Sequence, residues 1–269
     1  MSDHISPVNQ PGSWDSVAPG YASFIADHLG RYAYDALQWA EVQANERLLD
    51  VATGPGTLSL QAARITQVDA LDFSAGMLAQ VRQRADEAQL ANLTLHEGDG
   101  QALPFDDHVF DAAFSMFGLF MFPDRAKGFA ELARVVRPGG RVVVASWHNQ
   151  NVMPAFRIIS TEVQAATGAP PREEEDQPLA DPETFRTEME AAGFEVDIRA
   201  YTHTFEAASL AELWDGMRKS HIALHIVKPK LTPQRYEQLL QQIEQRLATV
   251  LGTGPQQVAM PAWLGLGRL

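Results

Sequence analysis

The chain has no cysteine among its 269 residues. This absence excludes disulfides, thiolate zinc sites and thiol nucleophiles, so that any metal would need histidine and carboxylate ligands. Basic residues are few, because 21 lysines and arginines stand against 34 acidic residues, for a formal net charge of −13. Such a surface repels a phosphate backbone unless its basic residues cluster, and they do not cluster in the sequence. We therefore expect no nucleic-acid partner and no metal.

Long apolar runs are also absent. No run approaches the roughly 20 residues that are needed to span a bilayer. The first residues, MSDHISPVNQPG, have neither the basic start nor the apolar stretch of a signal peptide. We expect a cytoplasmic protein without membrane insertion, and the oligomeric state stays open.

Short apolar runs alternate with helical patterns through the first half of the chain. Strands are expected at 47–51, 67–72, 93–97, 109–114 and 141–147, and helices at about 57–64, 75–89 and 125–136. A turn is expected at 137–140, from its proline and two glycines. Strands that alternate with helices predict an α/β fold with a parallel sheet covered on both faces. Ligands of such sheets bind at the carboxyl ends of the strands.

The remaining segments supply further helices and two more strands. Helical patterns cover 14–46, 153–167, 209–227 and 233–251; a further helix begins after Asp181 and ends at Gly193, and strands are expected at 194–204 and 258–269. The acidic run at 173–176 is typical of a solvated loop. We divide the chain into an N-terminal helical lid (1–45), a cofactor-binding core (46–148), a cap insertion (149–180), a continuation of the core (181–208), a helical cap (209–257) and a final core strand (258–269).

The stretch LLDVATGPGTL, residues 48–58, is a buried strand that ends in Asp50 and turns through small residues. Such a turn lets the backbone of 52–56 approach a ligand closely. The dinucleotide fingerprint is absent, because Ser59 occupies the position of its third glycine, and no phosphate-loop lysine follows. Asp50 would repel phosphate but attract an ammonium group. The loop therefore favours a cofactor that carries an amino acid.

Two further acids follow the next two strands. Asp72 ends the second strand, where a carboxylate can accept both hydroxyls of a ribose. Asp99 follows the third strand, where a carboxylate can accept the exocyclic amine of an adenine. Each acid could instead cap its own turn or the next helix. Their order beside this loop favours a cofactor site.

Five segments together resemble the class I S-adenosylmethionine-dependent methyltransferases, within the small-molecule group that includes the ubiquinone/menaquinone C-methyltransferases. They are LLDVATGPG (48–56), VDALDFSAGML (68–78), LHEGDGQALPF (95–105), FDAAFSMFGLFMFPD (110–124) and ELARVVRPGGRVVVASW (131–147). The family's glycine loop usually has a third glycine at the position of Ala52, which is a mild departure here.

The resemblance implies a Rossmann-like, seven-stranded, mostly parallel sheet with helices on both faces and a helical cap, and S-adenosyl-L-methionine as the cofactor. It implies that loop 52–56 holds the methionine part, Asp72 the ribose, and Asp99 and Gln101 the adenine side, with Ser115 near the sulfonium. The full expected set of cofactor-binding residues is Tyr21, Asp50, Ala52, Thr53, Gly54, Gly56, Asp72, Phe73, Met77, Asp99, Gly100, Gln101, Ser115 and Phe117.

Histidines are the candidates for further chemistry. His148 directly follows the fifth strand and could deprotonate an acceptor, although a loop histidine with a structural role is the alternative. His221 and His225 are spaced to share a helix face but lack the glutamate of a zinc motif, so they favour no metal site; either could face the acceptor instead. The apolar cluster at 116–122 lies where an acceptor pocket would lie, or is simple core.

The expected function is methyl transfer from S-adenosylmethionine to a small apolar or aromatic metabolite, at oxygen, nitrogen or carbon. Such an in-line displacement needs positioning and exclusion of water more than it needs a base. The alternatives are an RNA methyltransferase, which the charge disfavours, and a protein that binds the same cofactor without methylating. The identity of the acceptor stays open, because the cap would select it.

Overall fold

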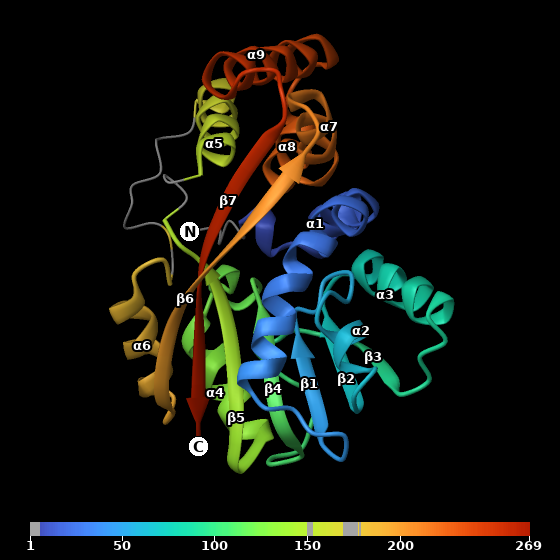
Figure 1. Cartoon of the computed structure of the whole chain (residues 1–269), viewed down its shortest axis with the longest axis vertical. Helices are drawn as coiled ribbons and strands as arrows, with labels where there is room; N and C mark the ends of the chain where they lie inside the picture. The colour runs from blue at the N-terminus through green and yellow to red at the C-terminus, as the bar shows by residue number, and fades with distance from the viewer. Residues whose placement is uncertain (1–5, 150–152, 169–176, 178) are drawn as a thin grey trace, which may run out of the picture.

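The computed structural model describes residues 6–149, 153–168, 177 and 179–269. In this part of the chain, seven strands form one sheet in the order β3-β2-β1-β4-β5-β7-β6 (Figure 1). Their bounds are β1 (Arg47–Val51), β2 (Gln67–Asp72), β3 (Leu93–Glu97), β4 (Phe110–Met116), β5 (Val136–Trp147), β6 (Glu195–Ala207) and β7 (Gln256–Arg268). Strands β1 to β5 pair in parallel, and β7 runs antiparallel to both of its neighbours. The predicted mostly parallel α/β sheet is confirmed.

Each buried strand sends alternate side chains into two separate cores. In β5, Val143 and Ala145 belong to the core under α1 (Pro11–Trp39) and α2 (Ser59–Ala62). Val142 and Val144 belong to the core on the opposite face, under α4 (Arg125–Val135) and α6 (Pro182–Ala191). Strands buried on both faces explain the nearly continuous apolar runs in the sequence.

A group of helices lies beyond the sheet, at the top of Figure 1, where β6 and β7 extend upward from the other strands. It contains α5 (Pro154–Thr167), α7 (Leu210–Ser220), α8 (Ile222–Val227) and α9 (Pro233–Leu251). These helices share a third core with the upper ends of β6 and β7. We call this group the cap; the remaining elements are α3 (Ala75–Glu87) and the short 3-10 helices η1 (Pro7–Asn9), η2 (Leu119–Met121) and η5 (Lys228–Lys230).

Several expected boundaries are wrong. The helical pattern at 209–227 is two helices, because His221 has an extended ψ of 111° between α7 and α8. His221 and His225 therefore do not share one helix face. The N-terminal helix begins at Pro11 and ends at Trp39 rather than Glu46. The expected turn at 137–140 lies within the irregular start of β5, where the register with β4 shifts. The acidic run at 173–176 lies outside the described residues.

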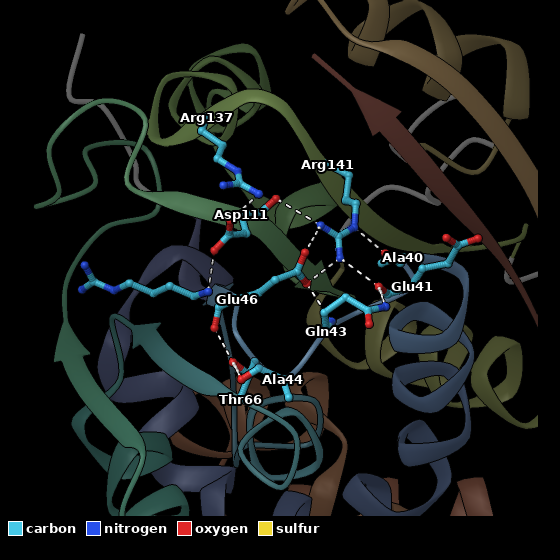
Figure 2. Close-up of polar contacts among 10 residues, drawn as sticks. Ala40, Glu41, Gln43, Ala44, Glu46, Thr66, Asp111, Arg137 and Arg141 are labelled. Atoms are coloured by element: carbon cyan, nitrogen blue, oxygen red, sulfur yellow. Dashed lines mark hydrogen bonds and ion pairs between the residues drawn. The ribbon is translucent and has the colours of Figure 1, made fainter.

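The lower end of α1 is tied to the sheet by a charged network (Figure 2). Arg141 on β5 forms two bonds with the Glu46 carboxylate, at 2.8 and 2.7 Å, and also donates to the carbonyl of Ala40 at the end of α1. Asp111 accepts from the Arg47 backbone N–H at 2.6 Å and pairs with Arg137 at 2.6 Å. This network lies at the amino ends of β1 and β4, so it is at the opposite end of these strands from their carboxyl ends.

Candidate active site

A cavity of about 330 Å³ lies at the carboxyl ends of β1, β2 and β4. Its walls come from four parts of the chain: the N-terminal segment with α1, the loop after β1, the end of β2 with the start of α3, and the loops after β3 and β4. The lining residues are Val8, Asn9, Pro11, Trp14, Tyr21, Leu29, Asp50, Ala52, Thr53, Gly54, Pro55, Thr57, Leu58, Leu71, Asp72, Phe73, Met77, Gly98, Asp99, Gly100, Gln101, Met116, Phe117, Gly118, Met121, Phe122 and Pro123. Twelve of the fourteen expected cofactor-binding residues are among them.

The loop after β1 exposes its backbone to this cavity. Ala52 and Gly54 have φ values of 56° and 55°, in the left-handed region that favours glycine. A side chain at Gly54 would meet nothing within 4 Å, so the positive φ rather than lack of space favours glycine here. The Gly54 N–H donates to the Asp72 carboxylate at 2.8 Å, which fixes the loop against the end of β2.

Asp50 is buried at the floor of the cavity. Its Oδ2 accepts from the Thr53 hydroxyl at 2.6 Å and from the Ser59 N–H at 3.1 Å, whereas its Oδ1 has no hydrogen-bond partner in the described part of the chain. The Thr57 hydroxyl, which also lines the cavity, is buried without a partner as well. Burial raises the pKa of Asp50 to about 7, despite the hydrogen bonds that oppose this shift. An unpaired buried acceptor and a nearby unpaired hydroxyl are costly in an isolated protein, which is typical of a binding site.

Asp72 is held rigidly at the end of β2. Besides Gly54, it accepts from the Ser74 N–H at 2.9 Å, so both of its oxygens are fixed by the backbone. Burial raises the pKa of Asp72 to about 6, and the nearby Asp15 charge adds to the rise while backbone hydrogen bonds oppose it. Each carboxylate oxygen keeps a further lone pair for a ligand.

Asp99 and Gln101 form one polar unit at the adjacent end of the cavity. Asp99 accepts from the Gln101 N–H at 2.9 Å and from its side-chain amide at 3.0 Å, and the Gln101 carbonyl oxygen accepts from the Asp124 N–H at 2.9 Å. Between them, Gly100 leaves room for Phe122, because a Cβ at this position would lie 2.5 Å from that ring. The glycine is therefore required for close packing and not for its backbone angle.

Residues 7–15, which we call the N-terminal strap, line the cavity; they belong to the segment 1–45 that we expected to form a helical lid, but none of them was among the expected cofactor-binding residues. The Trp14 indole donates to the Val8 carbonyl at 2.8 Å. Asp15 fastens the strap to the start of α3, because its Oδ1 accepts from the Ser74 hydroxyl at 2.6 Å and from the Gly76 N–H at 2.8 Å. No local sequence signal marks Asp15, since its partners are about sixty residues away.

Tyr21, about one and a half turns further along α1, is partly buried and lines the same cavity. Its burial, together with the Asp72 charge, raises the pKa of the phenol far above its ordinary value, so that the ring stays neutral. The edge of Trp14 packs against it, with 6.0 Å between the ring centroids. The expected position of Tyr21 beside the cofactor-binding loops is consistent with this placement.

Three expected site residues do not line the cavity. Ser115 is buried within β4, and its hydroxyl accepts from the Leu119 N–H at 3.2 Å. Gly56 lies next to the Leu60 side chain, and its positive φ of 86° allows the chain to turn here. His148 packs on Trp263, with 5.1 Å between ring centroids, and lies outside the walls of the cavity. The strand patterns placed these residues in the right segments, but could not show which way their side chains point.

Comparison with known proteins identifies the family. Residues 48–140 match the family model described as a methyltransferase domain. A demethylmenaquinone methyltransferase from Thermus thermophilus is 35% identical over 207 residues, which cover 68% of this chain and 91% of that protein. The chain belongs to the class I S-adenosylmethionine-dependent methyltransferases.

Other proteins share a shorter segment of this chain or only its fold. A demethylmenaquinone methyltransferase from Corynebacterium kroppenstedtii is 42% identical over 118 residues, which cover 44% of this chain and 48% of that protein. The methyltransferase chain thus spans about half the length of this relative. The YcgJ protein of Bacillus subtilis superposes with a TM-score of 0.59 over 88% of this chain and 98% of its own, at 18% identity, which shows the common fold.

Proposed function

We propose that this methyltransferase transfers a methyl group from S-adenosylmethionine to a small aromatic acceptor. The observation that carries the proposal is the pair of unpartnered polar atoms, Asp50 Oδ1 and Thr57 Oγ1, in the wall of a cavity at the carboxyl ends of the strands. A carboxylate and a hydroxyl in the wall of the same cavity match the ammonium and the carboxylate of an amino acid. Thr57 was not among the residues expected from the sequence.

The other polar residues of the cavity match the nucleoside half of the cofactor. Asp72 would accept the two ribose hydroxyls, because its oxygens are already oriented by Gly54 and Ser74. The Asp99–Gln101 unit would bind the exocyclic amine of adenine. The walls for the ring and the methionine chain come from Tyr21, Phe73, Met77 and Phe117, together with the backbone of Ala52, Thr53, Gly54 and Gly100.

The bound cofactor supplies an electrophilic methyl group on a sulfonium. The chain's own contribution is to hold the cofactor and to keep water out, since positioning accounts for much of the acceleration of such displacements. The strap closes one side of the cavity, and the apolar Met116, Phe117 and Met121 cover another. We assign no general base, because His148 lies outside the cavity.

The acceptor class is proposed from two sources. Relatives that share much of the chain are named demethylmenaquinone methyltransferases, so their acceptors are quinone-type rings. The apolar side chains after β4 suit such a ring better than a charged metabolite, because burying an unpaired charge is costly. A quinone-type small molecule, methylated on ring carbon as in the ubiquinone/menaquinone relatives, is therefore the proposed acceptor.

Mass spectrometry with a reduced acceptor tests this function. The chain is incubated with S-adenosylmethionine and 1,4-naphthalenediol under reducing conditions. We expect S-adenosylhomocysteine and a product heavier by one CH2 unit, in equal amounts. Cofactor consumption with any other change in acceptor mass would favour the non-methylating alternative, and bound cofactor without S-adenosylhomocysteine would contradict the proposed acceptor.

A further inference from the structure

A second, smaller hollow lies between α1 and the cap. Its walls are mostly aromatic and aliphatic: Phe24, Ile25, His28, Phe156, Phe205, Leu213, Met217, Ser220, His221, Val258 and Met260. We call it the cap hollow. It has a volume of about 20 Å³, room for about one water molecule. Of its polar side chains, Ser220 is satisfied, because its hydroxyl donates to the Gly216 carbonyl at 2.8 Å.

His221 is the unusual residue in this wall. Its Nδ1 is buried and has no hydrogen-bond partner among the residues that the structure describes. The residue sits at the break between α7 and α8, where its backbone N–H donates to Met217 at 2.8 Å and its carbonyl accepts from Leu224 at 3.0 Å. The backbone is therefore fixed at the point where the ring enters the hollow. A buried polar atom left without a partner costs free energy, and a ligand could supply that partner.

The imidazole is neutral in this setting. Burial lowers the pKa of His221 to about 4, and the neighbouring His225 adds to the fall. In a neutral imidazole Nδ1 either donates or accepts, depending on the tautomer. A hydroxyl group can do both, so it matches either tautomer, whereas a carboxylate matches only one and would bring an unpaired charge into an apolar space.

The cap hollow and the cofactor cavity lie on neighbouring sides of α1. Tyr21 and Leu29 line the cavity. Ile25 and His28, which fall between them in the sequence of α1, line the hollow. A second link runs through Tyr32. Its hydroxyl donates to the carbonyl of Met260 in the wall of the hollow, and its ring meets Phe117 of the cavity edge-on, at 5.2 Å between centroids.

We infer that the cap hollow extends the acceptor site beyond the apolar side chains after β4, and that His221 Nδ1 binds a hydroxyl group on a neutral aromatic acceptor. This rests on the proposed function and adds to it the residue that would distinguish a ring with a free hydroxyl from an amine or an acid. The rings of Phe24, Phe156 and Phe205 and the sulfur of Met217 provide favourable edge and sulfur contacts for an aromatic ring. His221 is in this account a specificity-determining residue.

The size of the hollow requires the cap to move when an acceptor enters. The cap helices pack mainly against one another, against α1 and against β6, and their core meets the parallel strands at Trp147, the last residue of β5. A shift of packed helices relative to α1 would widen the hollow without disturbing the strands that hold the cofactor. The aromatic side chains that now fill the space would then form the walls around the ring.

A binding experiment tests the inference in the presence of S-adenosylhomocysteine, so that no turnover occurs. The probes are 1-naphthol and naphthalene, which differ by one hydroxyl. We expect the wild type to bind 1-naphthol about 10-fold tighter than naphthalene. His221→Ala should remove this preference, and His221→Asn, whose amide can occupy the place of Nδ1, should restore much of it. His225→Gln is the matched control, because His225 lies in neither cavity wall and Gln can still donate to the backbone.

The outcomes separate this inference from the proposed function. If S-adenosylhomocysteine fails to bind the wild type, the proposed function fails and the subsite with it. If S-adenosylhomocysteine binds but the preference for 1-naphthol survives in His221→Ala, or neither probe binds, only the subsite is overturned. Because His221→Ala could destabilise the cap, the melting temperature and the S-adenosylhomocysteine affinity of each variant are measured. If His221→Ala does not fold, His221→Asn and Ile25→Phe take its place in the comparison. Ile25→Phe should fill the hollow and weaken the binding of 1-naphthol about 10-fold or more.

Discussion

The single residue Asp50 affects both the stability of the protein and the binding of the cofactor. Its Oδ2 is satisfied by Thr53 and Ser59, while its Oδ1 faces the cavity without a partner. Because burial raises its pKa to about 7, the folded chain holds this proton more tightly than the unfolded chain does. The stability that the folded chain gains from the protonated Asp50 is therefore fully present below the ordinary pKa of about 4, and it is lost as the pH rises through about 7.

Asp50→Asn should consequently stabilise the ligand-free protein at about pH 8, by about 1 to 3 kcal/mol, and much less at about pH 5. The amide oxygen can still accept from Thr53 and Ser59, but the charge for an ammonium group is lost. We expect cofactor affinity to fall about 10-fold or more at neutral pH. Thermal unfolding and titration calorimetry check the two effects.

The matched control is Asp86→Asn, at an exposed position on α3. It should change neither quantity. An Asp50→Asn protein that is less stable than the wild type at about pH 8 would contradict the assigned burial cost. Unchanged cofactor affinity would contradict its assignment to the ammonium group.

The N-terminal strap acts at the scale of an element. It is held by Asp15, which supplies a cap to the start of α3 from a distant part of the chain. A side chain at position 76 would approach the Asp15 Cα to 2.8 Å, so Gly76 is what allows this contact. The same element carries Val8, Asn9, Pro11 and Trp14 into the wall of the cofactor cavity.

Asp15→Ala should therefore weaken cofactor binding about 10-fold, mainly through faster dissociation, because the strap loses its fastening while Asp50 and Asp72 remain. Asp15→Asn keeps the accepting oxygen and should fall between the wild type and the alanine variant. Stopped-flow tryptophan fluorescence follows the release of the cofactor, and a Trp14→Phe background shows how much of the signal comes from Trp14, which lines the cavity. Identical dissociation rates in all three proteins would show that the strap does not retain the cofactor.

Elements were predicted from the sequence with unequal success. The bounds of β1, β2 and β3 agree with the expected ones, because β1 and β2 are short, mostly buried runs and β3 begins with alternating apolar and polar residues. The break at His221 was missed, since the amphipathic pattern continues through it. A lid was expected from residues 1–45, but the contacts of Asp15, the role of Thr57 and the direction of Ser115 were missed, because a local pattern cannot show contacts between distant segments.

At the scale of the whole molecule, binding and anchoring occupy opposite ends of the strands. The cofactor cavity lies at the carboxyl ends, and the network of Arg141 and Glu46 lies at the amino ends (Figure 2). The side chains of this pair are only 13% and 10% exposed, so that each charge depends on the other. Burial tends to raise the pKa of Glu46, but the bonds from Arg141 outweigh this and keep the pKa below its ordinary value.

Arg141→Met should lower the free energy of unfolding by about 3 kcal/mol at neutral pH, because Glu46 is left as a buried unpaired charge. The loss should shrink as the pH falls through the pKa of Glu46, since a protonated carboxyl needs no partner. Cofactor affinity at moderate temperature should stay unchanged. Denaturant unfolding at two pH values checks the first result, and a concurrent loss of cofactor affinity would contradict the separation of the two ends.

The central claim is that the cavity at the carboxyl ends of β1 and β2 is the S-adenosylmethionine site. Calorimetric titration of the wild type, Asp72→Ala and Asp86→Asn with S-adenosylmethionine tests it most directly. We predict one bound cofactor per chain for the wild type and for Asp86→Asn, and affinity at least about 10-fold weaker for Asp72→Ala. No binding to the wild type, or equal affinity in Asp72→Ala, would contradict the claim.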